Sequence, residues 1–293
     1  MSAGASTAIE VLGCRFRNPV LLAAGTAGFG RELAGIVDLS RLGGLVTKAV
    51  SLEPRRGNPA PRVAEFTGGM MNSVGLANPG LAEVRSSALP WLAREWPGLP
   101  VIVNIVGDTE EDYAGVVAGL EESPGITALE LNLSCPNSHA GGLEFGADAR
   151  SVAAVVGACR ARTRRPILAK LSPALPDIPA MAAAAIDAGA DGVSLVNTLP
   201  GYLFGATGAS TRLGQGNGGV SGPALLPIGV LAIRKVRQRL PAAVLVGVGG
   251  IRSAADARQY LRAGADLVAV GTAALADPRI PERIARELEQ SDG

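Results

Sequence analysis

Histidine and cysteine are scarce in this chain of 293 residues, which has one histidine and three cysteines. Structural metal centres are built mostly from these side chains at close spacings such as Cys-x-x-Cys, and no such spacing occurs here. The sequence therefore predicts no metal site and no iron–sulfur cluster of its own. So few cysteines are typical of a protein from a reducing compartment.

Net charge and long apolar runs are also lacking. The formal net charge is +1 at pH 7, with 18% charged residues, so no overall field favours nucleic acid or an anionic membrane. No segment reaches the roughly 18 uncharged apolar residues that a membrane-spanning helix needs. Residues 1–7 are small and polar, unlike a signal peptide. We therefore expect a cytoplasmic protein that binds neither nucleic acid nor a membrane.

Short apolar runs, by contrast, are plentiful, and segments with helical character separate most of them. We expect eight strands, at 20–24, 44–50, 100–106, 128–133, 166–171, 191–196, 243–248 and 266–270. Helices are expected near 79–94, 109–121, 148–163, 177–188, 223–239 and 253–262. This alternation predicts an α/β fold, a (β/α)8 TIM barrel, in a single domain over residues 1–293. A doubly wound open sheet has the same local pattern and stays as the alternative.

Two further segments lie outside this alternation. Residues 8–16 have the pattern of a small hairpin, which we expect to cover the floor of the barrel. Residues 51–78 are rich in Gly, Pro and Asn and are expected to form a long irregular loop. Loops of that length in a compact domain tend to be functional.

Cys135 is the first candidate for a reactive group. It follows the predicted strand 128–133, precedes a proline, and is flanked by Ser134 and Asn137. A free cysteine is more often a small buried apolar residue, but this one leaves the apolar run and enters a polar cluster. A Cys–His hydrolase pair is a competing interpretation. His139 lies only four residues on, whereas such dyads usually take their partners from separate elements.

Other predicted strands also end in residues suited to binding. Lys48 and Lys170 lie within apolar strands, where a buried ammonium is costly without an anionic partner. The last two strands end in glycines, at 247–250 and at Gly271, followed by Thr272. Glycines there let backbone N–H groups approach a phosphate, and barrels often bind phosphate after strands seven and eight. The pattern predicts a phosphorylated ligand across the barrel mouth, although tight turns alone would also explain the glycines.

In this order the motifs resemble the class 1 dihydroorotate dehydrogenases over nearly the whole chain. The segments that carry the resemblance are TKAV at 47–50, EPRRGNP at 53–59, NSVGLANPG at 72–80, VN at 103–104, NLSCPN at 132–137, KLSP at 170–173, NT at 197–198, GGVSGP at 218–223, GVGG at 247–250 and GT at 271–272. The resemblance implies oxidation of (S)-dihydroorotate to orotate by an FMN-dependent oxidoreductase of pyrimidine (UMP) biosynthesis.

The resemblance also implies roles for individual residues. Cys135 would be the base, Lys170 the cation beside the reduced flavin, and Lys48 a contact of both flavin and substrate. The implied substrate-binding residues are Lys48, Asn72, Ser73, Val74, Gly75, Leu76, Asn132, Asn197 and Thr198. The implied FMN-binding residues are Ala24, Gly25, Lys48, Ala49, Asn104, Asn132, Lys170, Val196, Gly222, Gly249, Gly250, Gly271 and Thr272.

Within the class, the segments at 197–201 and 218–223 look more like the NAD-linked (1B) subtype than the fumarate-linked one. Membrane-associated class 2 enzymes have serine in place of Cys135. The NAD-linked subtype implies a homodimer of this chain and a partner subunit that carries FAD and a 2Fe–2S cluster.

Some features depart from the pattern or allow other functions. Alanine stands at 23–24, where a serine that contacts FMN is common, and the Gly-rich stretch 202–217 could be a lid or a variable surface connection. The basic side chains of Arg55, Arg56 and Arg62 could attract an anionic substrate or simply solvate the long loop. The alternatives are a flavin-dependent dihydropyrimidine dehydrogenase and a non-catalytic barrel that binds a phosphorylated ligand.

Overall fold

The computed structural model describes residues 8–134, 145–205, 208 and 210–291. Eight parallel strands close into a barrel. In chain order they are β3 (Val20–Leu22), β4 (Gly44–Val46), β7 (Val101–Ile105), β8 (Ala128–Asn132), β9 (Ile167–Leu171), β10 (Gly192–Leu195), β13 (Val244–Val248) and β14 (Leu267–Val270). Each strand pairs with the next barrel strand along the chain, and β14 closes the ring on β3. The predicted TIM barrel is therefore confirmed, and the open sheet is excluded.

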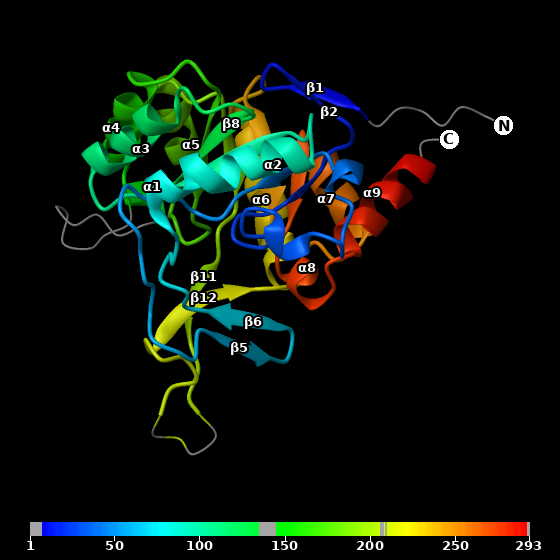
Figure 1. Cartoon of the computed structure of the whole chain (residues 1–293). Helices are drawn as coiled ribbons and strands as arrows, with labels where there is room; N and C mark the ends of the chain where they lie inside the picture. Colours follow the sequence, from blue (N-terminus) through cyan, green and yellow to red (C-terminus); the bar gives the residue numbers. More distant parts are fainter. Residues whose placement is uncertain (1–7, 135–144, 206–207, 209, 292–293) are drawn as a thin grey trace.

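Helices surround the barrel (Figure 1). They are α1 (Gly80–Glu83), a π-helical turn (Val84–Ala88), α2 (Leu89–Glu95), α3 (Glu110–Leu120), α4 (Ala149–Arg160), α5 (Ile178–Asp187), α6 (Leu225–Arg239), α7 (Ala254–Ala263), α8 (Thr272–Ala276) and α9 (Ile280–Ser291). Several start at side-chain caps: Thr109 and Asp112 form a capping box on α3, and Asp148, Asp177 and Ser253 cap α4, α5 and α7. None of the described helices is long and apolar enough to cross a membrane.

Two apolar clusters follow from the alternation of side chains along the strands. Outward-facing residues such as Leu129 and Leu131 pack against the helices. Inward-facing residues such as Val46, Ile102 and Leu168 fill the barrel interior. The predicted hairpin, β1 (Ile9–Val11) and β2 (Cys14–Phe16), is confirmed, and its side chains pack on this inner cluster as a floor.

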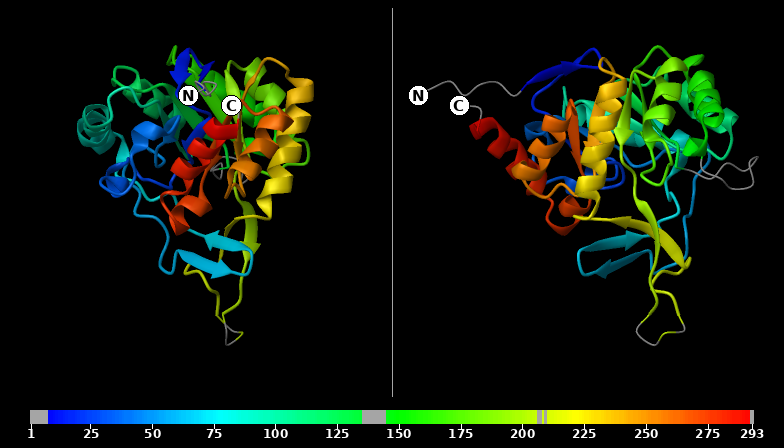
Figure 2. Two further views of the ribbon diagram at one scale, coloured as in Figure 1. Left: turned by 90° about the vertical axis from the view of Figure 1, so that its right-hand side faces the viewer. Right: turned by 180° about the vertical axis from the view of Figure 1, so that it is seen from behind.

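A four-stranded antiparallel sheet lies at the opposite end of the barrel from the hairpin, as Figures 1 and 2 show. Its strands are β5 (Val63–Phe66), β6 (Gly69–Asn72), β11 (Leu199–Tyr202) and β12 (Asn217–Ser221), in the order β11-β12-β6-β5. The prediction of a wholly irregular loop over 51–78 was therefore wrong. This sheet covers the end at which the barrel strands finish, the face that carries active sites in TIM barrels.

Candidate active site

Polar side chains face the barrel interior near the ends of four neighbouring strands. Val46, Ile102, Ala128 and Leu168 belong to the inner cluster, and residues two positions on share the same face of a strand. That rule places Lys48, Asn104, Glu130 and Lys170 one step closer to the mouth. One prediction needs correction here, because Lys48 lies two residues beyond the end of β4 and not within the strand.

Glu130 is the centre of a buried polar network and is 2% exposed. The side-chain amide of Asn104 donates to Oε1 of Glu130 at 2.7 Å, and the hydroxyl of Ser194 donates to Oε2 at 2.6 Å. Nζ of Lys170 lies 3.7 Å from Oε1, as an ion pair. The network joins side chains from β7, β8, β9 and β10, so it fixes Asn104 and Lys170 relative to each other.

Asn132 and Asn197 meet at the ends of β8 and β10. Nδ2 of Asn197 donates to Oδ1 of Asn132 at 3.1 Å, and the backbone N–H of Ser134 lies 3.4 Å from the same oxygen. The hydroxyl of Tyr113 donates to the carbonyl of Asn132 at 2.6 Å and so fixes its backbone. The amide of Asn197 is also tied to the chain, because its Oδ1 accepts from the N–H of Thr198 at 2.9 Å.

Lys48 is half-buried beside an exposed glycine turn, where a Cβ on Gly25 would come 3.9 Å from Nζ. Burial lowers the pKa of Lys48, the positive charge of Arg62 lowers it further, and Glu32 partly opposes them. In the described part of the chain, the Lys48 ammonium has neither a carboxylate within ion-pair distance nor a hydrogen bond. A half-buried ammonium that faces a second cation favours an anionic ligand.

The segment after β6 contains two residues in an uncommon backbone conformation. Gly75 and Leu76 are both left-handed, with φ of 69° and 55°, and this conformation is rare for leucine. The predicted Ser73 and Val74 are engaged by Asn58, whose amide donates to Oγ of Ser73 at 2.9 Å and whose N–H donates to the carbonyl of Val74 at 3.1 Å. Nothing in the described residues accepts a hydrogen bond from the N–H groups of Gly75 and Leu76.

Asn72 and Thr198 lie on either side of one strand of the covering sheet. Nδ2 of Asn72 donates to the carbonyl of Gly219 at 3.4 Å. A Cβ on Gly219 would overlap Oγ1 of Thr198, so only glycine allows this approach. Across the described residues, however, no hydrogen bond joins Asn72 to Asn132 or Asn197.

A second group of backbone donors lies after β13 and β14. Gly249 and Gly250 are left-handed, with φ of 117° and 74°. The N–H groups of Gly249, Gly250, Gly271 and Thr272 have no acceptor within the described ranges. A Cβ on Gly250 would come 2.5 Å from the backbone nitrogen of Leu226, so the turn packs tightly against the start of α6.

Tyr260, in α7, packs against this turn and holds its backbone in place. Its ring fills space left by two glycines, since a Cβ on Gly229 or Gly247 would overlap it. Its hydroxyl lies 2.9 Å from the carbonyl of Val248 and 2.8 Å from that of Gly249, both acceptors. Burial raises the pKa of Tyr260, so the hydroxyl stays a donor.

The turn after β14 is tied to the covering sheet. The hydroxyl of Thr272 donates to Oγ of Ser221, in β12, at 2.8 Å. This contact places the predicted phosphate-binding N–H groups directly beside the sheet that closes the mouth.

The remaining predicted cofactor contacts lie along the same rim. Ala24 follows β3, and Ala49 is buried beside Lys48. The N–H of Val196 donates to the carbonyl of Val248 at 2.9 Å. Gly222 follows β12, where a Cβ would come 2.8 Å from Cα of Gly69.

The predicted base, Cys135, lies outside the described residues, as do His139 and Asn137. The other two cysteines are unsuited to that role. Cys159 is buried in α4, and burial raises its pKa to about 12. Cys14 is half-buried in the floor hairpin, at the end of the barrel opposite the mouth.

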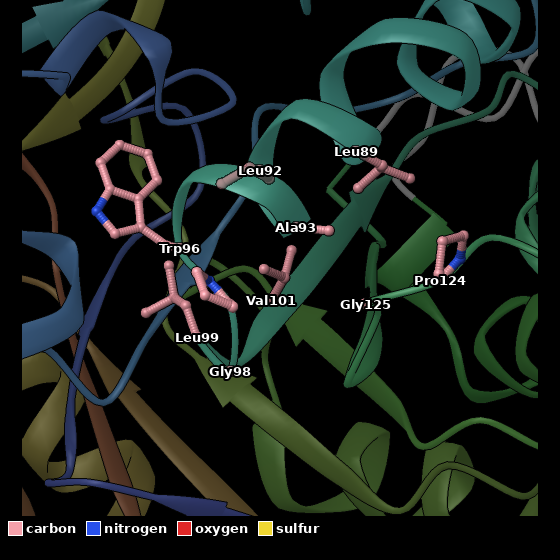
Figure 3. Close-up of a pocket in the computed structure, with 10 residues that line it drawn as sticks. Leu89, Leu92, Ala93, Trp96, Gly98, Leu99, Val101, Pro124 and Gly125 are labelled. Atoms are coloured by element: carbon pink, nitrogen blue, oxygen red, sulfur yellow. The ribbon is translucent and has the colours of Figure 1, made fainter.

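Figure 3 shows a pocket of about 180 Å³ between the end of α2 and the starts of β7 and β8. Leu92, Trp96 and Leu99 line it, with Val101 at the first residue of β7. This position is at the end where the barrel strands begin, away from Lys48, Asn104, Glu130 and Lys170. No titratable side chain lines it, so we assign it no part in the chemistry.

Comparison with known proteins decides the family. The family model described as Dihydroorotate dehydrogenase matches residues 6–291. The chain belongs to the dihydroorotate dehydrogenase family. It is 48% identical over 97% of its length to a protein from Desulforudis audaxviator and 44% identical over 96% to one from Cutibacterium acnes, in each case covering 92% of the relative. Both relatives are named dihydroorotate dehydrogenase B (NAD(+)), catalytic subunit.

The predicted family, and with it the enzyme class of oxidoreductase, is confirmed. Dihydroorotate dehydrogenases generally use a flavin, and the described residues fit a phosphorylated one. Four backbone N–H groups are available after β13 and β14, and the turn that carries two of them packs so closely on Leu226 that a Cβ on Gly250 would not fit. Residues that the sequence analysis missed are Glu130, Ser194 and Tyr260. A glutamate on the inward face of an apolar strand was the one signal that could have revealed Glu130.

Proposed function

We propose that the chain is the catalytic subunit of an NAD-linked dihydroorotate dehydrogenase, one barrel domain that binds FMN in its mouth and oxidises (S)-dihydroorotate to orotate in pyrimidine biosynthesis. One observation carries the proposal. Two lysines, Lys48 and Lys170, approach the mouth from inside the barrel, and neither ammonium makes a hydrogen bond within the described part of the chain. Such an arrangement suits a planar, electron-rich ligand between them.

The phosphate of FMN would be held by the N–H groups of Gly249, Gly250, Gly271 and Thr272, with Gly222 and Val196 on the same rim. Lys48 would contact both ligands, because Gly25 on one side leaves its ammonium accessible. The amides of Asn132 and Asn197 each offer a donor and an acceptor, as a pyrimidine ring requires. The backbone N–H groups of Gly75 and Leu76, in the segment after β6, would add donors, and Asn72 and Thr198 would add polar side chains.

The reaction removes a proton from one ring carbon of dihydroorotate and a hydride from the neighbouring carbon. The bound flavin supplies the hydride acceptor. Cys135 would take the proton as thiolate, and an ordinary thiol with a pKa of about 8.5 holds only a few per cent of that form at neutral pH. Lys170 would stabilise negative charge that develops at the flavin edge, a contribution of a few kcal/mol by analogy with an oxyanion donor.

Formation of orotate from dihydroorotate with an artificial electron acceptor tests this proposal. We expect turnover with dihydroorotate and little with dihydrouracil, which lacks the carboxylate that the Lys48 side of the mouth would bind. The reverse preference would favour a dihydropyrimidine dehydrogenase. A purified chain without bound flavin would favour a non-catalytic barrel.

The names of the two relatives, which include NAD(+) and a catalytic subunit, support a proposal for the electron acceptor. We propose that electrons leave through a partner subunit that carries FAD and a 2Fe–2S cluster, with this chain as a homodimer. Co-expression with such a subunit should give NAD reduction by dihydroorotate. Equal turnover of the isolated chain with fumarate would contradict this assignment.

A further inference from the structure

We propose that Glu130 is a positioning residue that compensates the charge of Lys170 and keeps its ammonium aimed into the mouth. This inference rests on the proposed function, because Lys170 is the cation assigned to the flavin edge. Glu130 lies one step below the mouth, and Lys170 is 8% exposed. A carboxylate and an ammonium at this depth are each costly unless their charges are compensated.

The interior of the barrel holds few other charges. On the inward faces of the eight barrel strands, and over the two residues after each within the described ranges, the titratable side chains are Lys48, Glu130 and Lys170. Lys48 belongs to the β4 side and faces Arg62 and Glu32. Glu130 is therefore the carboxylate that offsets the charge of Lys170.

Glu130 compensates the charge of Lys170 without accepting a hydrogen bond from it. Asn104 and Ser194 donate to the two oxygens of Glu130 at 2.7 and 2.6 Å. These two hydrogen bonds hold the carboxylate in place, and the ammonium of Lys170 lies 3.7 Å from Oε1, beyond hydrogen-bond distance. That distance keeps the electrostatic attraction but leaves the N–H donors of Lys170 for a ligand.

A purely structural role explains these features less well. The layer below, with Ile102, Ala128 and Leu168, is filled by apolar side chains. Replacing a buried ion pair by packed apolar residues is often neutral or stabilising, so stability alone does not call for a charge at position 130. A role in function explains the charge better, because a fixed Glu130 carboxylate compensates the charge of a lysine that would contact a redox ligand.

Glu130→Gln is the direct test, since the amide keeps the size of the side chain and can still contact Asn104 and Ser194. In this variant Lys170 is a buried ammonium without a carboxylate, which favours the neutral amine. Reduction of the flavin adds negative charge beside it and favours the ammonium again. We therefore expect reduction of E130Q to take up one more proton per two electrons than reduction of the wild type at alkaline pH.

The measurement is the midpoint potential of the bound flavin against pH, by titration with a chemical reductant. E130Q should show the steeper slope, and the double variant E130Q/K170M should lose it, because the extra proton belongs to Lys170. Ser194→Ala keeps the charge, and Asp266→Asn removes a distant ion pair with Arg237 (2.8 Å); both should keep the wild-type slope. A wild-type slope in E130Q, or a steeper slope that persists in E130Q/K170M, would overturn the proposal.

A second measurement covers the case in which E130Q does not hold flavin. In the apoprotein, K170M leaves the buried Glu130 carboxylate uncompensated and should lower the urea midpoint of unfolding. Adding E130Q should then restore part of that loss. If E130Q lowers the midpoint equally with Lys170 and with Met at position 170, the two residues are independent and the proposal fails.

The titration needs bound flavin but not activity toward dihydroorotate. A chain that a chemical reductant bleaches and dihydroorotate does not would contradict the proposed function, while the proton count would still decide the role of Glu130.

Discussion

Asn197 donates a hydrogen bond from Nδ2 to Oδ1 of Asn132 at 3.1 Å, which joins the ends of β8 and β10 across the intervening strand β9. The Tyr113 hydroxyl donates to the backbone carbonyl of Asn132, and the Thr198 N–H donates to Oδ1 of Asn197. Both amides are thus fixed before a ligand arrives. Fixed donors and acceptors lower the entropic cost of binding a rigid ring.

Asn197→Ala should therefore weaken substrate binding more than it slows chemistry. It removes one direct hydrogen bond and the group that orients Asn132, for a loss of about 1–2 kcal/mol. We expect KM for dihydroorotate to rise roughly tenfold, with a smaller effect on kcat. The matched control is Gln238→Ala, which deletes an exposed side-chain amide on the outer helix α6 and should keep the wild-type KM. Equal KM values in N197A and wild type would contradict this role.

Lys48 should make orotate binding depend on pH. Its pKa is lowered in the free protein, first by burial and then by Arg62, and an anionic ligand favours the ammonium form. Binding should therefore take up a proton, so that affinity is constant below the lowered pKa of Lys48 and falls as the pH rises through it. Titration of bound flavin with orotate at several pH values measures this. Lys48→Met should bind weakly without that pH dependence, and Lys235→Met, on the exposed side of α6, should behave as wild type.

Tyr260→Phe should loosen the turn at 247–250. The variant removes the hydroxyl donor from both carbonyls: Val248 keeps the N–H of Val196 as a donor, whereas Gly249 has no other donor within the described residues. We expect a cost of about 1–3 kcal/mol in the free energy of unfolding. The FMN dissociation constant should rise several-fold, because the N–H groups of the same turn are less well fixed. Tyr202→Phe, on an exposed side chain of β11, is the control. An unchanged dissociation constant in Y260F would show that the turn holds its shape without the hydroxyl.

Cys135→Ser should leave FMN content intact and remove most of the rate of flavin reduction by dihydroorotate, since a serine hydroxyl is a far weaker base than a thiolate. In the wild type, that rate should rise toward alkaline pH as the thiolate fraction grows. Cys14→Ser, in the floor hairpin, should keep the wild-type rate. If C135S kept most of its rate, another group would have to be the base.

The barrel was predictable because each strand lies in a mostly apolar run, and a segment with helical character follows most of these runs. The covering sheet was not, since its strands contain Gly, Pro, Met and Asn and pair across long stretches of chain, as Gly219 does with Asn72. Pairing of that kind leaves no local pattern in the sequence.

The same contrast between local patterns and long-range contacts applies to single residues. Asn132, Asn197 and Lys170 stood out because they lie at or near strand ends. The role of Glu130 was not predictable, because it depends on Asn104 and Ser194, which belong to other strands and come close only in the folded barrel.

In the function proposed above, the barrel holds a flavin that takes electrons from dihydroorotate. The most direct measurement is an anaerobic titration of the purified chain with dihydroorotate, followed by the visible absorbance of oxidised flavin. We expect stoichiometric bleaching, one dihydroorotate per flavin, with orotate as the product. A yellow protein that dihydroorotate does not bleach, although a chemical reductant does, would contradict the proposed function.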